Sequence, residues 1–199
     1  MIDYLIHFYR KDTVPFRSLS ALSDVEAMQL MHNLYIEGSI FWERFKDPAE
    51  YLQARRQIEQ WLHQEFIAKG GAPKESYPIY MILGRSKWLL TAADAMTVAT
   101  TAEIQVPLSL FGEGEISFTY PDSMVSMWLA TQKDSAYYLP DYHGKLFTLS
   151  EVRAIIEANG LPGETWGTNL PSFLANYIEA QVWNHAPLLA PEKAKYFYT

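Results

Sequence analysis

One stretch of the chain places three chemically capable side chains at the end of an expected strand. Residues 117–124 begin as an alternating strand and are interrupted at Pro121, so that Tyr120, Asp122 and Ser123 lie close together. Strand ends and the loops after them are where rigid scaffolds present catalytic and binding groups. The alternative is a plain turn, in which Asp122 caps the following helix and Tyr120 packs on the sheet. Tyr120 is therefore a catalytic candidate, and Asp122 and Ser123 are candidate ligand-binding residues.

A late strand expected over residues 178–183 contains a single acid. If its alternate apolar residues face the core, Glu179 and Gln181 share the other face with Tyr177 and Trp183. A partly apolar setting of that kind could raise the pKa of a carboxyl group or form a ligand pocket. The alternative is an ordinary solvent-facing surface. Glu179 is a catalytic candidate, and Gln181 is a candidate ligand-binding residue.

Three aromatic or imidazole side chains complete the set of candidates. His7 lies within an apolar N-terminal segment, so the alternative to a catalytic role is a core histidine bonded to a backbone or carboxylate group. His143 is in a turn beside Tyr142, where a histidine near a cleft can act as an acid, a base or a ligand. Trp166 lies in a loop, as a lid or as a plug over the core. We include His7 among the catalytic candidates, and His143 and Trp166 among the ligand-binding ones.

Local motifs for several common chemistries are missing from the sequence. Residues 84–87 lack the glycine spacing of a phosphate loop, and the Gly-Glu-Gly at 112–114 leads into a strand rather than a helix. The five histidines are scattered without metal-ligand spacing, and the chain has no cysteine. We therefore predict no metal site, and the sequence names no cofactor.

The elements that position these residues follow from apolar periodicity and capping signals. Helices are expected to begin after three capping residues, namely Ser23, Asp47 and Thr148. The glycines expected to end them are Gly38, Gly70 and Gly160. A short helix is expected over residues 171–176, whereas residues 123–130 fit either a helix or a strand.

Alternating or continuously apolar segments predict the strands. The main ones are expected over residues 2–9, 77–83, 103–108, 115–120 and 178–183. The turn at 112–114 separates the third strand from the fourth, so these two are expected to form a hairpin. Shorter strands are expected at residues 137–139, 145–147 and 196–199.

The order of these elements indicates the fold class. Regular strand–helix–strand alternation is absent, which favours an α+β fold with a mainly antiparallel sheet. Helices are expected in the N-terminal third and near the C-terminus. The length of 199 residues favours one domain spanning residues 1–199.

Composition limits the partners and the location of the protein. The hydrophobic fraction of 49% is typical of a globular protein, and a net charge of -7 argues against nucleic-acid binding. Arg55 and Arg56 are interpreted as part of a solvated helix face with local salt bridges. The sequence shows no apolar run long enough for a membrane span and no signal-peptide pattern. We therefore expect a soluble, cytoplasmic protein without a membrane partner.

Several segments together resemble a family of uncharacterised bacterial proteins. They are residues 66–71, 118–124, 142–144, 147–149 and 178–183. The resemblance spans most of the chain and implies a bacterial protein with a domain of unknown function, and it brings no activity with it.

A second resemblance, in residue order alone, is to the ADP-ribosyltransferase fold. Those enzymes place a His or Arg on the first strand, a Ser, Thr or Tyr after a middle strand, and a Glu on a late strand. The residues in that order here are His7 or Arg10, Tyr120 or Ser123, and Glu179. The resemblance implies an NAD-dependent enzyme in which the glutamate holds the nicotinamide ribose and supports an oxocarbenium-like transition state.

Three hypotheses about function remain open, and they leave open whether the protein is an enzyme. The first is a cleft at the strand ends that binds a small polar ligand through Tyr120, Asp122, His143 and Glu179. The second is the NAD-dependent transferase. The third is a protein-interaction module with an exposed aromatic surface, and self-association is also left open. The residues expected to form that surface are Tyr137, Tyr138, Tyr142, Trp166 and residues 196–198.

Overall fold

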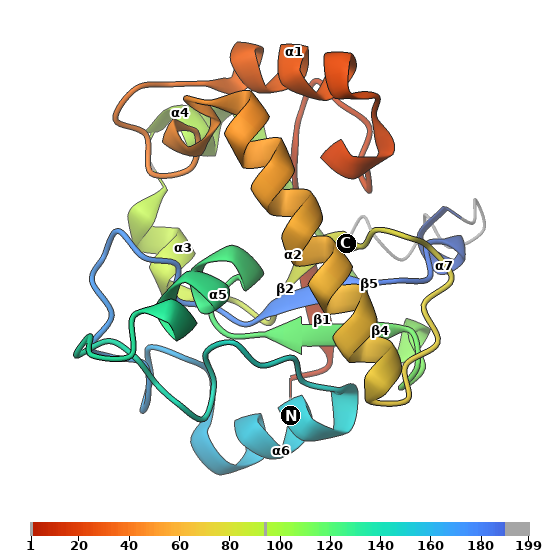
Figure 1. Ribbon diagram of the computed structural model, residues 1–199, viewed down its shortest axis with the longest axis vertical. Helices are drawn as coiled ribbons and strands as arrows, with labels where there is room; N and C mark the ends of the chain where they lie inside the picture. The colour runs from red at the N-terminus through yellow and green to blue at the C-terminus, as the bar shows by residue number, and fades with distance from the viewer. Residues whose placement is uncertain (1, 94, 190–199) are drawn as a thin grey trace.

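The computed structural model describes residues 2–93 and 95–189, and within them a five-stranded antiparallel sheet carries helices on both faces (Figure 1). The strands are β1 (Tyr4–Arg10), β2 (Ile79–Leu83), β3 (Thr101–Pro107), β4 (Ile116–Thr119) and β5 (Glu179–Val182). Their order across the sheet is β3-β1-β2-β5-β4, and each neighbouring pair is antiparallel. The expected α+β class with an antiparallel sheet is confirmed.

Three helices begin after the capping residues that predict them, Ser23, Asp47 and Thr148. The helices of the described residues are α1 (Asp24–Leu34), α2 (Pro48–Ala68), α3 (Lys87–Ala92), α4 (Ala95–Thr100), α5 (Ser123–Thr131), α6 (Leu149–Asn159) and α7 (Ala186–Leu189). Short 3₁₀ turns are η1 (Leu19–Ala21), η2 (Glu43–Phe45) and η3 (Leu108–Leu110). Ser23 and Thr148 each form a full capping box, and Asp47 accepts the backbone N–H of Glu50. Each side chain thus satisfies a backbone N–H that the first turn of a helix leaves free.

The expected hairpin between the third and fourth strands is wrong. β3 pairs with β1, from Tyr4 opposite Pro107 to Arg10 opposite Thr101, whereas β4 pairs with β5 at the other edge of the sheet. The chain leaves β3 through the turn η3, where the backbone N–H of Leu108 donates to the carbonyl of Asp3 rather than to a returning strand. The turn residues therefore connect two opposite edges of the sheet.

Other local predictions also differ from the structure. Residues 137–139 and 145–147 are turns and loops, apart from one isolated bridge between Phe118 and Phe147. Residues 171–176 form a turn instead of a helix, and 123–130 belong to helix α5. α3, α4 and α7 have no counterpart in the sequence predictions. The strand expected at 196–199 lies outside the described residues.

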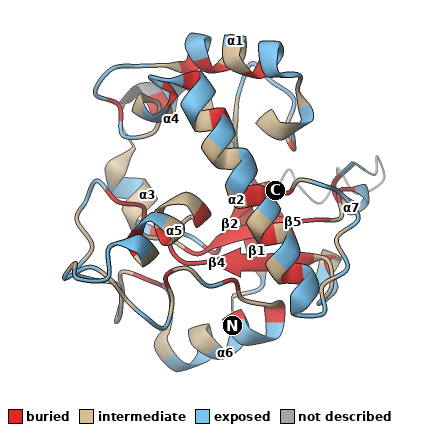
Figure 2. Ribbon diagram, in the orientation of Figure 1, coloured by how far each residue is buried: buried red, intermediate tan, exposed pale blue. Residues whose placement is uncertain are grey.

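Both faces of the sheet are covered, and the strands are buried throughout much of their length (Figure 2). One face, which we name the α6 face, packs Leu149 and Val152 of α6 against apolar strand residues. The other, the α2 face, is crossed by α2, whose Leu62 and Phe66 pack on Trp183 just after β5 (Figure 1). The solvent-facing alternative for the Glu179 side of β5 is therefore wrong, because α2 and α5 cover it.

A separate apolar cluster lies at the N-terminal half of α2. Met31 and Leu34 of α1 pack there with Phe45 of η2 and Leu52 of α2. Figure 1 shows α1 at the far end of α2, away from the strands. Because α2 joins this helical cluster to the sheet at an angle, a cavity remains between the two.

A candidate ligand-binding cavity

A cavity of about 950 Å³ lies between the α1–α2 cluster and the α2 face of the sheet. Strands β1, β2, β3 and β5 line it on one side, and α1, α2, α3 and α4 contribute to its other walls. Aromatic side chains are prominent in the lining, among them Phe8, Phe41, Trp42, Tyr51 and Tyr177. Small-molecule sites are typically concave spaces of about 300–1,000 Å³ with mainly apolar walls and a few polar groups. The cavity fits this description.

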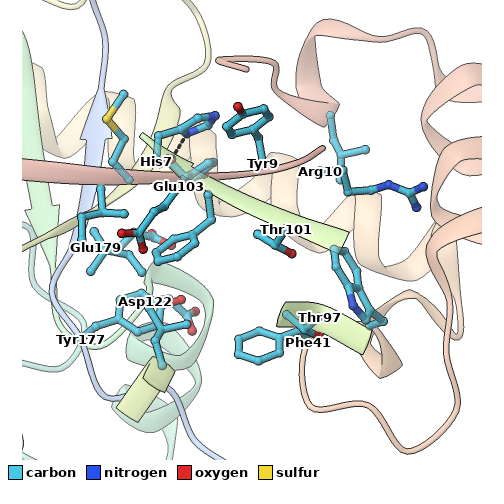
Figure 3. A pocket seen from close by; sticks show the side chains of 18 of the residues that line it. His7, Tyr9, Arg10, Phe41, Thr97, Thr101, Glu103, Asp122, Tyr177 and Glu179 are labelled. Atoms are coloured by element: carbon cyan, nitrogen blue, oxygen red, sulfur yellow. Dashed lines mark hydrogen bonds between the residues drawn. The ribbon is translucent and has the colours of Figure 1, made fainter. Parts of the chain in front are cut away.

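The main polar group in the cavity wall is the Glu179 carboxyl at the start of β5 (Figure 3). Its Oε1 accepts the backbone N–H of Ser123 at 3.0 Å and the side-chain amide of Gln181 at 3.0 Å. Beside it, Asp122 caps helix α5 by accepting the backbone N–H of Val125 at 3.0 Å. A carboxylate can accept about four hydrogen bonds, so Glu179 retains capacity to accept a further one from a ligand.

The environment of Glu179 raises its pKa to about 7. Burial is the largest cause, and the negative charge of Asp122 adds to it, although the bonds from Ser123 and Gln181 act in the opposite direction. Burial also raises the pKa of Asp122. Near neutral pH the two carboxyl groups therefore carry fewer than two full negative charges, and Glu179 can both accept and donate a proton.

A buried polar network holds Glu179 in place from beneath. The Gln181 amide nitrogen donates to Thr119 Oγ1 at 3.0 Å as well as to Glu179, and its carbonyl oxygen accepts from Ser117 Oγ at 3.0 Å. Ser117 in turn accepts the indole N–H of Trp183 at 2.9 Å. Gln181 is fully buried and does not line the cavity. The structure therefore makes it a residue that positions Glu179 rather than one that reaches a ligand.

Arg55 forms part of the cavity wall on α2. Its Nε donates to Glu59 Oε1 at 3.0 Å and its guanidinium lies 4.6 Å from the centre of the Tyr80 ring. The interpretation of Arg55 as solvated is wrong, whereas the neighbouring Arg56 is exposed and pairs with Asp24. Arg55 follows Tyr51 by four residues on the apolar stripe of α2, and this spacing is the signal that could have indicated its burial.

The structure places Tyr120 on the opposite side of the sheet from Glu179. Thr119 pairs directly with Glu179, so the next residue along the chain points to the α6 face. There the Tyr120 hydroxyl donates to Asn176 at 3.0 Å, and its ring packs 4.5 Å from that of Trp166. Trp166 is partly buried against the core in this cluster. Neither side chain lines the cavity.

His143 belongs to the same aromatic cluster and also lies apart from the cavity. Its Nδ1 accepts the backbone N–H of Leu139 at 3.0 Å, which places the proton of the neutral ring on Nε2. Within the described residues this buried nitrogen has no hydrogen-bond partner. Burial lowers the pKa of His143 to about 4, so the ring is neutral at physiological pH.

His7 is a core histidine bonded to backbone groups, which is the alternative to a catalytic role that the sequence left open. Its Nε2 accepts the backbone N–H of Phe16 at 2.9 Å, and Nδ1 lies 3.2 Å from the carbonyl oxygen of Tyr80. Burial lowers its pKa to about 4. Figure 3 shows His7 and Tyr9 on the other side of β1 from Asp122 and Tyr177. The imidazole therefore has both nitrogens engaged and faces away from the Glu179 end of the cavity.

Of the eight sequence candidates, the structure brings Glu179, Asp122 and Ser123 together at one end of the cavity. Tyr177 lies beside them, as the alternation of residues 177–183 predicted, and burial together with the two carboxyl groups raises its pKa. Sequence reasoning missed Arg44, whose positive charge acts against the effect of burial to lower the pKa of Asp122. It also missed Phe8 as a lining residue. The sequence offered no signal for this role, because an apolar residue in an apolar strand fits a packed core as well as a cavity wall.

Two further findings concern metal binding and membrane spans in the described residues. No group of three or more His, Asp or Glu side chains in residues 2–93 and 95–189 could hold a metal ion. In the same part of the chain, no helix is both long enough and apolar enough to cross a membrane.

Comparison of the chain with protein-family models, with curated proteins and with solved structures finds no match. The cavity and the residues that line it are therefore the basis for assigning a function.

Proposed function

We propose that the protein binds a small amphipathic molecule in the cavity between the α1–α2 cluster and the sheet. The observation that carries this proposal is a cavity of about 950 Å³ that is lined by aromatic side chains and bounded at one end by the buried Glu179 carboxyl. If these residues served only to stabilise the fold, their side chains would pack against one another and leave no cavity, since protein interiors are close-packed. A partly open space with many aromatic residues in its walls and a well-held carboxyl group instead suits a ligand.

The chemistry of Glu179 indicates which ligand group it would hold. A carboxyl with a pKa of about 7 can accept a hydrogen bond when ionised and donate one when protonated. Hydroxyl, amide and amine groups are suited to such an anchor. The apolar part of the ligand would lie against Phe8, Phe41 and Tyr177.

A second candidate is the NAD-dependent transferase. It is favoured by one observation, which is that Arg10, Ser123 and Glu179 line the same cavity in the order that the resemblance requires. In that function Glu179 would hold the ribose hydroxyls and Arg10 would face the phosphates, while NAD would supply the transferable ADP-ribose. His7 and Tyr120 take no part, because their side chains face away from that end of the cavity.

The test is a thermal-shift and ligand-observed NMR screen of the purified protein. The probes are aromatic alcohols, amines and amides, nucleosides, sugars and NAD, and nicotinamide release is followed in the NAD samples. A ligand at about a hundred times its dissociation constant should stabilise the protein by roughly 2.7 kcal/mol. Glu179→Gln should weaken binding of the best probe by about tenfold or more, which is the range for loss of a charge-assisted hydrogen bond.

Glu157→Gln is the matched control, since Glu157 is exposed on α6 and lies outside the cavity. It should leave binding unchanged. A screen without any stabilising probe, or a probe that binds both variants equally, would contradict the proposal. Nicotinamide release that Glu179→Gln abolishes would select the transferase over simple binding.

A further inference from the structure

Arginine is unevenly distributed over this acidic protein. Five of its seven arginines line the cavity, whereas no lysine among the described residues does so. The five are Arg10, Arg17, Arg44, Arg55 and Arg85. The chain as a whole has a net charge of -7, so this concentration opposes its overall charge. A guanidinium group differs from an ammonium group in presenting a rigid fork of donors that matches phosphate and carboxylate.

Three of these arginines have structural roles that account for them. Arg55 is buried in its pair with Glu59, and Arg85 pairs with Glu103 on β3. The guanidinium of Arg44 lies 5.2 Å from the centre of the Phe45 ring and acts on the Asp122 carboxyl. Arg10, which has one exposed aspartate as its ion-pair partner, and Arg17 remain to be considered.

Arg10 is held only by a weak and replaceable partner. It pairs with Asp12, whose side chain is 62% exposed, through Nε and Nη2. Exposed ion pairs contribute only about 0–1 kcal/mol, so a ligand anion can take the place of Asp12 at little cost. Arg17 is exposed and has no ion-pair partner among the described residues.

A second feature at the same place is an unsatisfied hydroxyl. Thr101 of β3 is directly opposite Arg10 of β1, so the two side chains leave the sheet on the same face as near neighbours. Both line the cavity, away from Asp122 and Tyr177 (Figure 3). Thr101 Oγ1 is buried and has no hydrogen-bond partner in the described part of the chain. Buried hydroxyls are normally bonded, so a partner that the protein itself does not provide is indicated.

We propose that the ligand of the cavity carries an anionic group, a phosphate or a carboxylate, which Arg10 and Thr101 bind at this end. This inference rests on the proposed function and adds the charge of the ligand to it. The position of the anion follows from the cavity itself, because the Asp122–Glu179 end would repel a negative group whereas the Arg10 end attracts it. The ligand is thus an amphipathic anion whose uncharged polar end meets Glu179.

The test needs no knowledge of the whole ligand. Pyrophosphate and acetate are titrated at low ionic strength, with chloride at matched ionic strength as the reference, since salt weakens exposed charge interactions. The readout is the NMR signals of the arginine Nε–H groups and of the Thr101 amide. We expect saturable shifts at Arg10 and Thr101 and none at Arg56 and Arg153, the two arginines that do not line the cavity. Larger shifts with pyrophosphate would assign a phosphate, and larger shifts with acetate a carboxylate.

Variants separate this inference from the proposed function. Arg10→Gln should lower anion affinity by about tenfold, the equivalent of one charge-assisted bond, and Thr101→Val, which keeps the shape of the side chain, should also lower it. Arg153→Gln is the matched control and should change nothing, and Glu179→Gln should still bind the anion. Equal shifts at Arg56 and Arg153, or no saturable shift at Arg10, would overturn the inference. If the screen for amphipathic ligands succeeds while this titration fails, only the anionic group is wrong.

Discussion

The two faces of the sheet are both covered by helices, yet they are built differently. On the α6 face, apolar strand residues such as Phe118 and Ile116 pack directly against α6 and its neighbours. The α2 face has packing of that kind around Trp183, where it meets Leu62 and Phe66 of α2. Towards the N-terminal half of α2 it changes to a cavity with a carboxyl pair and arginines in its walls.

The difference shows how alternation along a strand divides two roles. In β5, Ala180 and Val182 complete the core of the α6 face, while Glu179 and Gln181 supply the polar groups of the α2 face. A single four-residue strand thus contributes to stability with one set of side chains and to the candidate site with the other. Substitutions on the two faces should therefore have separable effects.

The largest expected effect compares two phenylalanines. Phe118 is 0% exposed in the α6-face core, and Phe118→Ala should reduce the free energy of unfolding by about 4 kcal/mol because it leaves a cavity. Phe8 is 38% exposed in the cavity wall, and Phe8→Ala should cost no more than about 1 kcal/mol. Urea denaturation measures both. Similar losses for the two variants would remove the distinction between the faces.

Two adjacent arginines of α2 should give the next largest difference. Arg55→Ala leaves Glu59 without its buried ionic partner and should destabilise the protein by about 3 kcal/mol. Arg56→Ala breaks only an exposed pair with Asp24 and should cost about 0–1 kcal/mol. Thermal unfolding of both variants, with Arg56→Ala as the matched control, provides the measurement. An Arg55→Ala variant as stable as the wild type would show that this cavity wall does not depend on the pair.

The smallest expected effect is a pH dependence that depends on Glu179. Folding raises the pKa of this carboxyl from 4.5 to about 7, so the folded protein binds more protons than the unfolded chain between these values. Stability conferred by the protonated group is therefore present below about pH 4.5 and is lost as the pH rises to about 7. Glu179→Gln has no proton to lose there. Its stability relative to the wild type should rise by about 1–3 kcal/mol from pH 4.5 to pH 8.

Unfolding curves for both proteins over that pH range supply the comparison. Histidines and the other carboxyls are present in both proteins, so their contributions largely cancel in the difference. A difference between the two proteins that does not vary with pH would mean that Glu179 keeps an ordinary pKa.

Three helix starts and the five main strands were predictable because their determinants are local. Ser23, Asp47 and Thr148 lie next to the backbone groups that they cap, so the chemistry is visible within four residues. Strand pairing was not predictable, because β4 finds its partner in β5 far along the chain. The mistaken hairpin arose because a glycine-containing turn was read as local evidence for a contact that depends on the whole sheet.

Part of the candidate site was also predictable, because some of its residues can be recognised from local sequence features. Glu179, Asp122 and Ser123 were found from their types and their positions at strand ends, and the structure brings them together. Tyr120 does not join them, because the pairing of Thr119 with Glu179 turns it to the other face, where His143 stacks against it. That register is a property of two distant strands. Local sequence patterns also could not predict that Arg10 and Thr101 lie close together, because they become neighbours only through the β1–β3 pairing.

The position of β5 between β2 and β4 has a consequence for biosynthesis. Its partners in the sheet, residues 79–82 and 116–119, leave the ribosome long before residues 179–182 do. Until then β2 and β4 each present an unpaired backbone edge, which is a template for association with other chains. Such long-range pairing also slows folding, because distant segments must meet before either is stabilised. Nascent chains of this protein should therefore depend on protection from aggregation until residues 179–182 have been synthesised.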